Sequence, residues 1–135
     1  MNYTTNYHLP QWEKSDRIQM EDFNSAFQIV DETFPQVFLG TYTGNGAYGS
    51  GSPTGLTFPF QPWFIAIFSP DGVYRLLCAR GAAKVNTSPN GHSYGALAVT
   101  WGENSVAWHT TSSGSDANYQ MNKADSVYSY LVIGR

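Results

Sequence analysis

The sequence predicts a mainly β protein, an antiparallel β-sandwich or barrel preceded by one short N-terminal α-helix. Three observations lead to this prediction. All 13 glycines lie at or after Gly40, and the β-rich runs of residues 36–135 are short and separated by turn residues. Only one stretch, which ends before Pro35, repeats its apolar residues at helical spacing. The change in composition at Pro35 predicts two domains, 1–35 and 36–135.

Residues 1–35 are expected to form an extended arm followed by an amphipathic helix. The opening "MNYTTNYHLPQWEKSD" is polar and aromatic and contains a proline. Either Ser15 or Asp16 is expected to cap the helix start. Pro35 is expected to end the helix, because proline disfavours the helical region for the residue before it.

The apolar face of this helix has two possible uses. Its residues recur at spacings of three and four and comprise Met20, Phe23, Phe27, Val30 and Phe34. The stripe could pack against the β-domain of its own chain. It could instead form a short helical bundle that assembles several copies of the chain, and the spacing alone leaves both possibilities open.

The strands of residues 36–135 are predicted from short apolar or alternating runs. In chain order they are 36–43, 55–60, 63–68, 73–79, 94–101, 104–111, a weaker 117–122 and 127–134. The run "WFIAIF" at 63–68 is apolar throughout, so it is expected to be buried on both faces. In the last run, the side that carries Val127, Leu131 and Ile133 is expected to face the core, opposite Tyr128 and Tyr130.

The stretch between the first two strands contains a glycine pattern. Gly44 to Gly49 matches the G-x-G-x-x-G pattern of a dinucleotide-binding turn. That turn must lead into a helix whose N-terminus faces the pyrophosphate, whereas this one leads into "SGSPTG" and another strand. We therefore interpret residues 44–55 as a flexible connection whose glycines supply positive φ angles.

Composition restricts the classes of function. Charged residues make up 13% of the chain and aromatic residues 16%, whereas soluble domains average about 25% charged residues. The net charge of −3 argues against nucleic acid, which requires a basic face. No apolar run reaches the roughly 18 residues of a membrane span, and the N-terminus lacks a signal-peptide pattern.

Catalytic residue patterns are sparse. His8, His92 and His109 lack metal-ligand spacing, and the single cysteine, Cys78, lies among apolar neighbours and is expected in the core. The acidic residues of the β-domain fall in predicted turns. We therefore predict no enzyme activity, no metal and no cofactor.

Groups that can bind a neutral ligand are better represented. Aromatic rings offer apolar faces to sugars, and nearby amide, carboxylate and imidazole groups can bond to hydroxyls. The predicted ligand-binding residues are Trp101, Trp108, His109, Asp116, Asn118, Tyr119, Tyr128 and Tyr130. The alternative is that one or both tryptophans belong to the core, and that Asp116 only forms a turn.

Both halves of the chain resemble small tail-associated structural proteins of phages and prophages of Gram-positive gut bacteria. In "YTTNYHLPQWEKSDRIQMEDFNSAF" the matching residues are Thr5, Asn6, Tyr7, Leu9, Trp12, Asp16, Arg17, Asp22, Phe23 and Asn24. The second half matches at 40–49, at 56–62, at "VTWGENSVAWHT", at "YQMN" and at 128–134. The segments "LTFPFQPWFIAIF" and "YSYLVIG" are also distantly similar to H-type lectin domains.

These resemblances imply a non-catalytic, H-type-lectin-like or jelly-roll-like sandwich located in the virion, in a phage tail, after synthesis in the bacterial cytoplasm. The implied partners are further copies of the chain in a homotrimer, other tail proteins bound by the N-terminal segment, and a host-surface glycan. One alternative is a purely structural tail or decoration protein without a ligand. Another is a glycan-cleaving tail enzyme, which would require two converging carboxylates.

Overall fold

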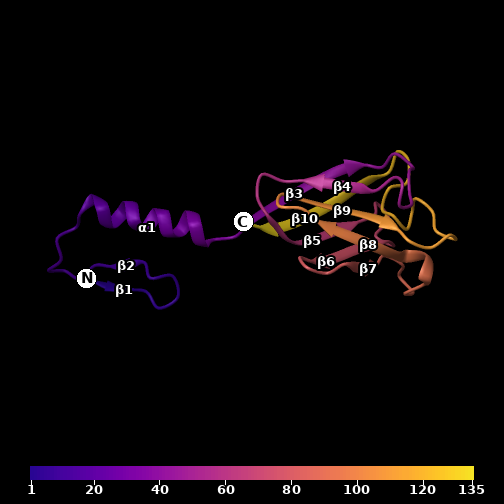
Figure 1. The fold of residues 1–135 in the computed structure, drawn as a ribbon. Helices are drawn as coiled ribbons and strands as arrows, with labels where there is room; N and C mark the ends of the chain where they lie inside the picture. Colours follow the sequence, from indigo (N-terminus) through magenta and orange to yellow (C-terminus); the bar gives the residue numbers. More distant parts are fainter. The chain divides into compact units, whose positions relative to one another are not determined.

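The structure, a computed structural model, describes all 135 residues and divides them into two compact units, Met1–Pro35 and Gln36–Arg135 (Figure 1). The first unit contains strands β1 (Asn2–Tyr3) and β2 (Pro10–Gln11) and helix α1 (Met20–Thr33). The second unit contains eight strands and one short 3-10 helix, η1 (Ser93–Gly95). Because each unit has its own internal contacts, we describe them separately.

The N-terminal arm is a small hairpin, which corrects the expectation of an extended arm. Strands β1 and β2 pair antiparallel, with Asn2 opposite Gln11 and Tyr3 opposite Pro10. The rings of Tyr3 and His8 are stacked, with 4.4 Å between their centroids. Helix α1 lies beside this arm, because the centroids of the Trp12 and Phe23 rings are 4.9 Å apart.

The end of α1 is as predicted, but its start is not. Helix α1 begins after Gln19, which makes no side-chain capping bond. Asp16 is unavailable as a cap, since one carboxylate oxygen accepts from Glu13 N at 2.7 Å and the other from the Met1 ammonium at 3.1 Å. The expected cap at Ser15 or Asp16 is therefore wrong. Phe34 leaves the helix in an extended conformation, and Pro35 follows it.

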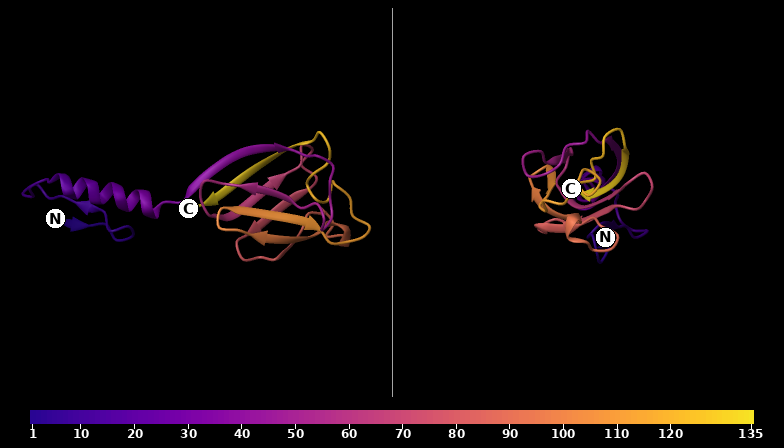
Figure 2. Two further views of the ribbon diagram at one scale, coloured as in Figure 1. Left: turned by 45° about the horizontal axis from the view of Figure 1, so that its top comes forward. Right: turned by 90° about the vertical axis from the view of Figure 1, so that its right-hand side faces the viewer.

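The second unit is a sandwich of two four-stranded antiparallel sheets (Figure 2), which confirms the predicted fold class. One sheet has the order β3-β10-β5-β6 and consists of β3 (Gln36–Thr43), β10 (Val127–Gly134), β5 (Pro62–Phe68) and β6 (Arg75–Ala79). The other has the order β4-β9-β8-β7 and consists of β4 (Thr54–Thr57), β9 (Ser105–Thr110), β8 (Ala96–Trp101) and β7 (Lys84–Asn86).

Two strand predictions need correction. Residues 117–122 form turns rather than a strand, and Met121 has a positive φ of 58°. The chain curls there, with Asn122 N donating to Ala117 O at 2.8 Å. Strand β7 lies in a stretch that the sequence predicts as a loop. The reason is that its three residues include only one apolar side chain, that of Val85.

The two faces of β10 are reversed relative to the expectation. Tyr128 is 2% exposed and Val132 is fully buried, whereas Val127 is 49% exposed. Tyr128 pairs with Tyr42, and their rings are stacked with centroids 5.1 Å apart. The Tyr128 hydroxyl accepts a hydrogen bond from Lys123 N at 3.0 Å, so its polar end is satisfied inside the sandwich.

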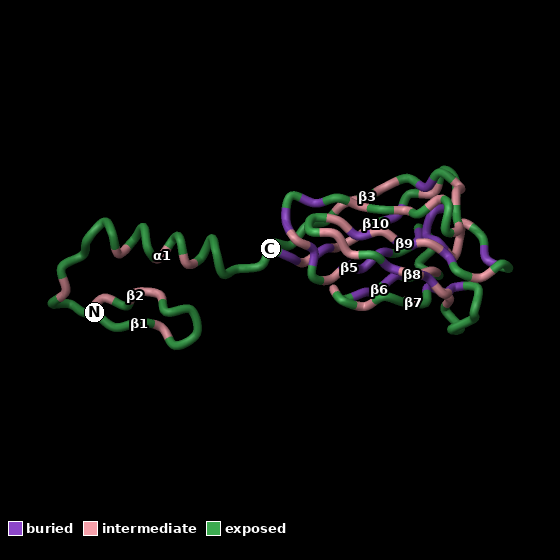
Figure 3. The backbone as a smooth tube through the Cα atoms, in the orientation of Figure 1, coloured by how far each residue is buried: buried purple, intermediate pink, exposed green.

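Strand β5 is buried on both faces only in its middle. Ile65 and Ile67 face the core and are fully buried, and Ala66 on the other face is 8% exposed. Trp63 and Phe68 remain exposed, so the expectation of burial along the whole strand is corrected at its ends. The core between the sheets includes Phe58, Phe60, Leu76, Cys78, Leu97, Val99, Val106, Trp108 and Met121. Cys78 is therefore a core residue, as expected. Figure 3 shows the buried residues concentrated in this unit and α1 mostly exposed.

Candidate functional site

The glycine-rich loop connects β3 to β4 and passes from one sheet of the sandwich to the other. Gly46 and Gly49 have φ angles of 85° and 90°, which confirms the expectation that glycines supply positive φ here. Gly44 is buried, and a side chain at this position would clash with the backbone carbonyl of Lys123. A strand rather than a helix follows the loop, so it lacks the geometry of a dinucleotide-binding turn.

Asn122 holds the first half of this loop in place. Its Nδ2 donates to Asn45 Oδ1 at 2.6 Å and to Ala47 O at 2.8 Å. Its Oδ1 accepts from Asn45 N at 3.2 Å, and its backbone carbonyl accepts from Gly46 N at 2.8 Å. One buried amide side chain thus satisfies several loop backbone and side-chain groups at once.

Gln120 holds the second half of the loop. Its Nε2 donates to Ser52 O at 2.8 Å and to Thr54 Oγ1 at 3.1 Å. Its Oε1 accepts from Gly49 N at 2.8 Å and from Thr110 N at 3.0 Å. The side chain is fully buried. The expectation of a flexible connection is therefore wrong, because two buried amides fix the loop along its length.

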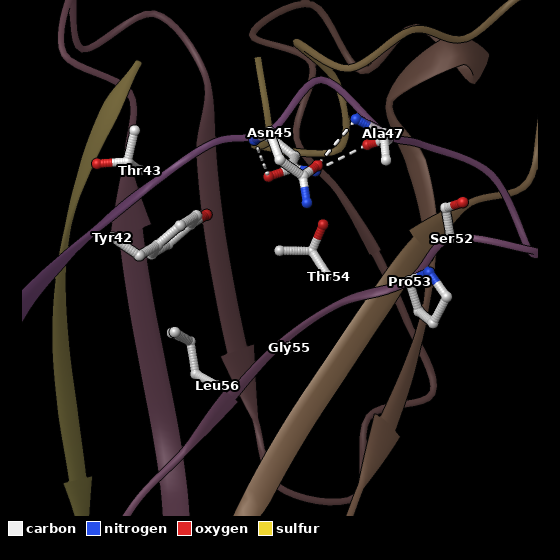
Figure 4. Close-up of a pocket in the computed structure, with 10 residues that line it drawn as sticks. Tyr42, Thr43, Asn45, Ala47, Ser52, Pro53, Thr54, Gly55 and Leu56 are labelled. Carbon is white, nitrogen blue, oxygen red and sulfur yellow. Dashed lines mark hydrogen bonds between the residues drawn. The ribbon is translucent and has the colours of Figure 1, made fainter. Parts of the chain in front are cut away.

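A pocket of about 420 Å³ lies beneath this loop, between the ends of β3 and β4 (Figure 4). Its walls are made of hydroxyl, amide, aromatic and aliphatic groups. The lining residues are Tyr42, Thr43, Asn45, Ala47, Ser52, Pro53, Thr54, Gly55, Leu56 and Asn122. Because no acidic residue, basic residue or histidine lines it, the pocket is suited to an uncharged polar ligand.

Two of the predicted ligand-binding rings lie in the core. Trp108 is 1% exposed, and its Nε1 donates to Gln120 O at 2.8 Å. Tyr128 is buried as described above. Their rings fill the space between the sheets, so they are not part of an exposed aromatic surface. The alternative that a tryptophan belongs to the core is confirmed for Trp108.

Three further predicted residues are half-buried. Trp101 donates from Nε1 to Ala82 O at 3.0 Å, and the Arg80 guanidinium lies 5.7 Å from its ring centroid. Tyr130 lies against the core, with its ring 6.0 Å from that of Phe58. His109 lies on β9 and is also half-buried. These contacts give Trp101 and Tyr130 packing roles.

The last three predicted residues lie in the turns after β9. Asp116 Oδ1 accepts from Asn118 N at 2.9 Å and from Tyr119 N at 3.3 Å, a typical turn role for aspartate. The Tyr119 ring makes an edge contact with Tyr74, at 5.4 Å between centroids. Asn118 and Tyr128 line one smaller pocket of about 220 Å³. The structure therefore separates the eight predicted residues into core, half-buried and turn positions.

The pKa values of the buried tyrosines Tyr42 and Tyr128 are raised above the ordinary value, and the largest cause is burial. Burial raises the pKa of Tyr42, and the neighbouring Tyr128 raises it further. Tyr42 therefore stays protonated and donates its hydroxyl proton to Met121 O at 2.7 Å. No group of three His, Cys, Asp or Glu side chains is placed to hold a metal ion.

The sequence did not predict the pocket beneath the loop or the two amide side chains, Gln120 and Asn122, that support it. One signal was present, since "YQMN" contains two amide residues and "GNG" lies in a glycine-rich stretch. Asn45 and Asn122 are 77 positions apart in the chain, so only the fold shows that they bond.

Comparisons with protein-family models, with curated proteins and with solved structures found no match to this chain. None of its helices has the length and apolar character needed to cross a membrane.

Proposed function

We propose that the protein is a non-catalytic structural subunit of a phage tail that assembles with copies of itself and binds a host-surface glycan through its β-sandwich. The observation that supports self-assembly best is the exposed apolar stripe of α1. The tail setting, the virion location and the trimer are proposed from the resemblances described in the sequence analysis. In this proposal the N-terminal unit assembles the copies and attaches them to other tail proteins.

The stripe of α1 is defined by Met20, Phe23, Phe27 and Val30 of the helix and by Phe34, the residue that follows it. Within the N-terminal unit no residue of the helix is buried, and Met20 and Phe27 are 77% and 68% exposed. Burying a side chain of this size stabilises a structure by about 1.5–3 kcal/mol. A 14-residue helix is marginal in water by itself, so contact between stripes of several copies supplies stability that α1 lacks.

A second apolar surface lies on the outer face of the β3-β10-β5-β6 sheet. Strand pairing places Val37 beside Ile133 and Phe64, and Leu39 beside Leu131 and Ala66. Leu77 continues the second of these rows on β6. Leu39 is 72% exposed, although solvent-facing sides of antiparallel sheets are commonly polar.

The partner we propose for this sheet face is a second copy of the chain. Only one charged side chain, that of Arg75, projects from the face, so it offers little to a highly charged partner. Val37 and Leu39 also follow Phe34 closely in the chain, which means that the apolar character of α1 continues into β3. Large exposed apolar patches mark interaction sites. In a symmetric dimer the same patch of each copy is buried at once.

A purely structural function without a ligand is the second candidate. It is favoured by the burial of Trp108 and Tyr128, which removes two aromatic rings from the predicted glycan surface. The two functions differ in whether the assembled protein binds host cell walls or arrayed glycans. A homo-oligomer that binds neither supports the structural function, whereas a monomer that binds neither overturns both.

A further inference from the structure

We propose that the pocket beneath the glycine-rich loop binds one or two rings of a neutral saccharide. This inference depends on the glycan-binding part of the proposed function and is independent of self-assembly, since all lining residues belong to one sandwich. The volume of about 420 Å³ falls within the range of about 300–1,000 Å³ typical of small-molecule sites.

Absence of charge distinguishes this pocket from two other hollows of the sandwich. The pocket between β6 and β7 includes Arg75, and the pocket near Asn118 includes Asp71 and Lys123. An anion or cation in the loop pocket would lose its hydration without gaining an ionic partner. The lining therefore favours a ligand that is polar but uncharged.

Several hydrogen-bonding groups of the lining are free to reach a ligand. Asn45 Oδ1 accepts from Ala47 N at 2.9 Å and from Asn122 Nδ2. These two bonds orient the Asn45 amide and leave its Nδ2 as a donor. Figure 4 shows the Asn45 side chain at the pocket, above Thr54. The Thr54 hydroxyl, which accepts from Gln120 Nε2 at 3.1 Å, points toward Asn45 and can donate to a ligand. The hydroxyl-bearing residues Thr43 and Ser52 also belong to the lining.

The apolar part of the lining complements these groups. Tyr42, Pro53 and Leu56 contribute ring and aliphatic surface. The Tyr42 ring is held by stacking on Tyr128 and by its hydroxyl bond to Met121 O. A ligand that combines many hydroxyls with an apolar C–H face satisfies both parts of the lining, and a sugar ring has this combination.

The walls of the pocket are held in place before any ligand binds. Gln120 and Asn122 fix the loop from Asn45 to Thr54 through the bonds described above. A ligand therefore does not have to order the loop, and binding avoids that entropic cost. Individual saccharide sites are weak, and several copies in one assembly raise the apparent affinity.

The test is an NMR titration of the full-length, ¹⁵N-labelled protein with N-acetylglucosamine, methyl galactoside and methyl glucoside, and with glucuronate as a charged comparison. At least one neutral probe is expected to give saturable shifts of the Asn45, Ala47, Ser52 and Thr54 amides, with weaker binding of glucuronate. Saturable shifts confined to other parts of the sandwich, or no saturable shift with any neutral probe, would overturn the proposal.

Two variants make the test specific. Ala47→Leu fills part of the pocket and is expected to weaken binding at least about tenfold, whereas Ser50→Leu, an exposed change in the same loop, leaves it unchanged. Asn45→Asp keeps the oxygen that accepts from Ala47 N and Asn122 Nδ2 but removes the Nδ2 donor, so it is expected to weaken binding of the neutral probes at least about tenfold. Equal affinity of Asn45→Asp and wild type, with Ala47→Leu folded and binding normally, contradicts the assigned site.

A mass measurement on the same samples separates this inference from the proposed function. An oligomer without saccharide binding contradicts only the pocket assignment. A monomer that binds the saccharide in the pocket contradicts only self-assembly. A monomer that binds none of the neutral saccharides contradicts both proposals.

Discussion

The two units of the chain differ in how they bury their apolar side chains and in how they pair their polar groups. The sandwich buries its large side chains between two sheets and uses buried amides to satisfy the loop above them. The N-terminal unit leaves the α1 stripe exposed, with only Trp12 and Tyr7 stacked on Phe23 and Phe34. The difference indicates that the sandwich is stabilised by its own interior, whereas contacts within the N-terminal unit leave much of the stripe uncovered. We propose that copies of the chain cover it.

The largest expected effect is a loss of stability in the sandwich. Trp108→Ala opens a cavity in the core and leaves Gln120 O without its donor, so we expect the free energy of unfolding to fall by about 3–5 kcal/mol. Urea denaturation measures this change. Trp63→Ala is the matched control, since Trp63 is partly exposed, and a loss as large as that of Trp108→Ala would contradict the difference in burial.

A smaller loss of stability is expected from the loop support. Gln120→Leu keeps much of the side-chain shape but removes the partners of Gly49 N, Thr110 N and Ser52 O. We expect a loss of about 2–3 kcal/mol, because buried groups left without partners are costly. Amide hydrogen exchange at Gly49 should accelerate as well. Gln61→Leu, at a half-buried position, should change neither quantity by a comparable amount.

Assembly should respond to a charge on the stripe while the sandwich stays folded. Phe27→Lys places an ammonium on the α1 stripe and removes about 1.5–3 kcal/mol of apolar burial per chain from a stripe-to-stripe contact. Sedimentation velocity is expected to show a shift toward smaller species. Asn24→Lys adds the same charge to an exposed polar position of the same helix. Identical behaviour of the two variants would argue against the stripe as the contact.

The outer sheet face allows a similar comparison on β3. Leu39→Lys interrupts an apolar row, whereas Thr41→Lys adds the same charge at another exposed position on the same side of the strand. We expect Leu39→Lys to lower the fraction of assembled protein more than Thr41→Lys does. If neither variant changes this fraction, the sheet face is not part of the assembly, and α1 alone remains the proposed contact.

The smallest expected effect is a pH response of the N-terminal arm. The Glu13 backbone N–H and then the Met1 ammonium lower the pKa of Asp16 from its ordinary value of 3.8. A lowered pKa in the folded state stabilises the arm above the unfolded value, and this contribution disappears as the pH falls through the folded pKa. NMR signals of the arm should therefore change below pH 3.8. Asp16→Asn should abolish that change, and its persistence would assign the transition to another group.

The sequence predicts the helix, its end at Pro35 and most strands, because these depend on local periodicity and on proline. It does not predict which face of β10 is buried, because a buried tyrosine needs a partner for its hydroxyl. That partner, Lys123 N, is supplied by the turn before the strand. Residues 117–122 alternate like a strand, yet Gln120 and Asn122 bond to a loop about 70 positions away and hold the segment in turns.

The candidate site was less predictable than the fold. Aromatic residues near the end of the sequence suggested an exposed surface, but Trp108 and Tyr128 fill the core. The pocket depends instead on β3, the glycine-rich loop and Asn122, which come together only when the sandwich closes. Glycine and amide residues have no periodicity that marks them as pocket walls.

The central claim, that the exposed apolar surfaces assemble copies of the chain, is tested most directly by the mass of the full-length protein in solution. Light scattering over a range of concentrations is expected to give three times the chain mass of 14.9 kDa. A mass equal to another multiple of the chain mass would change the proposed copy number but would still support self-assembly. A constant mass of 14.9 kDa at every concentration would contradict it.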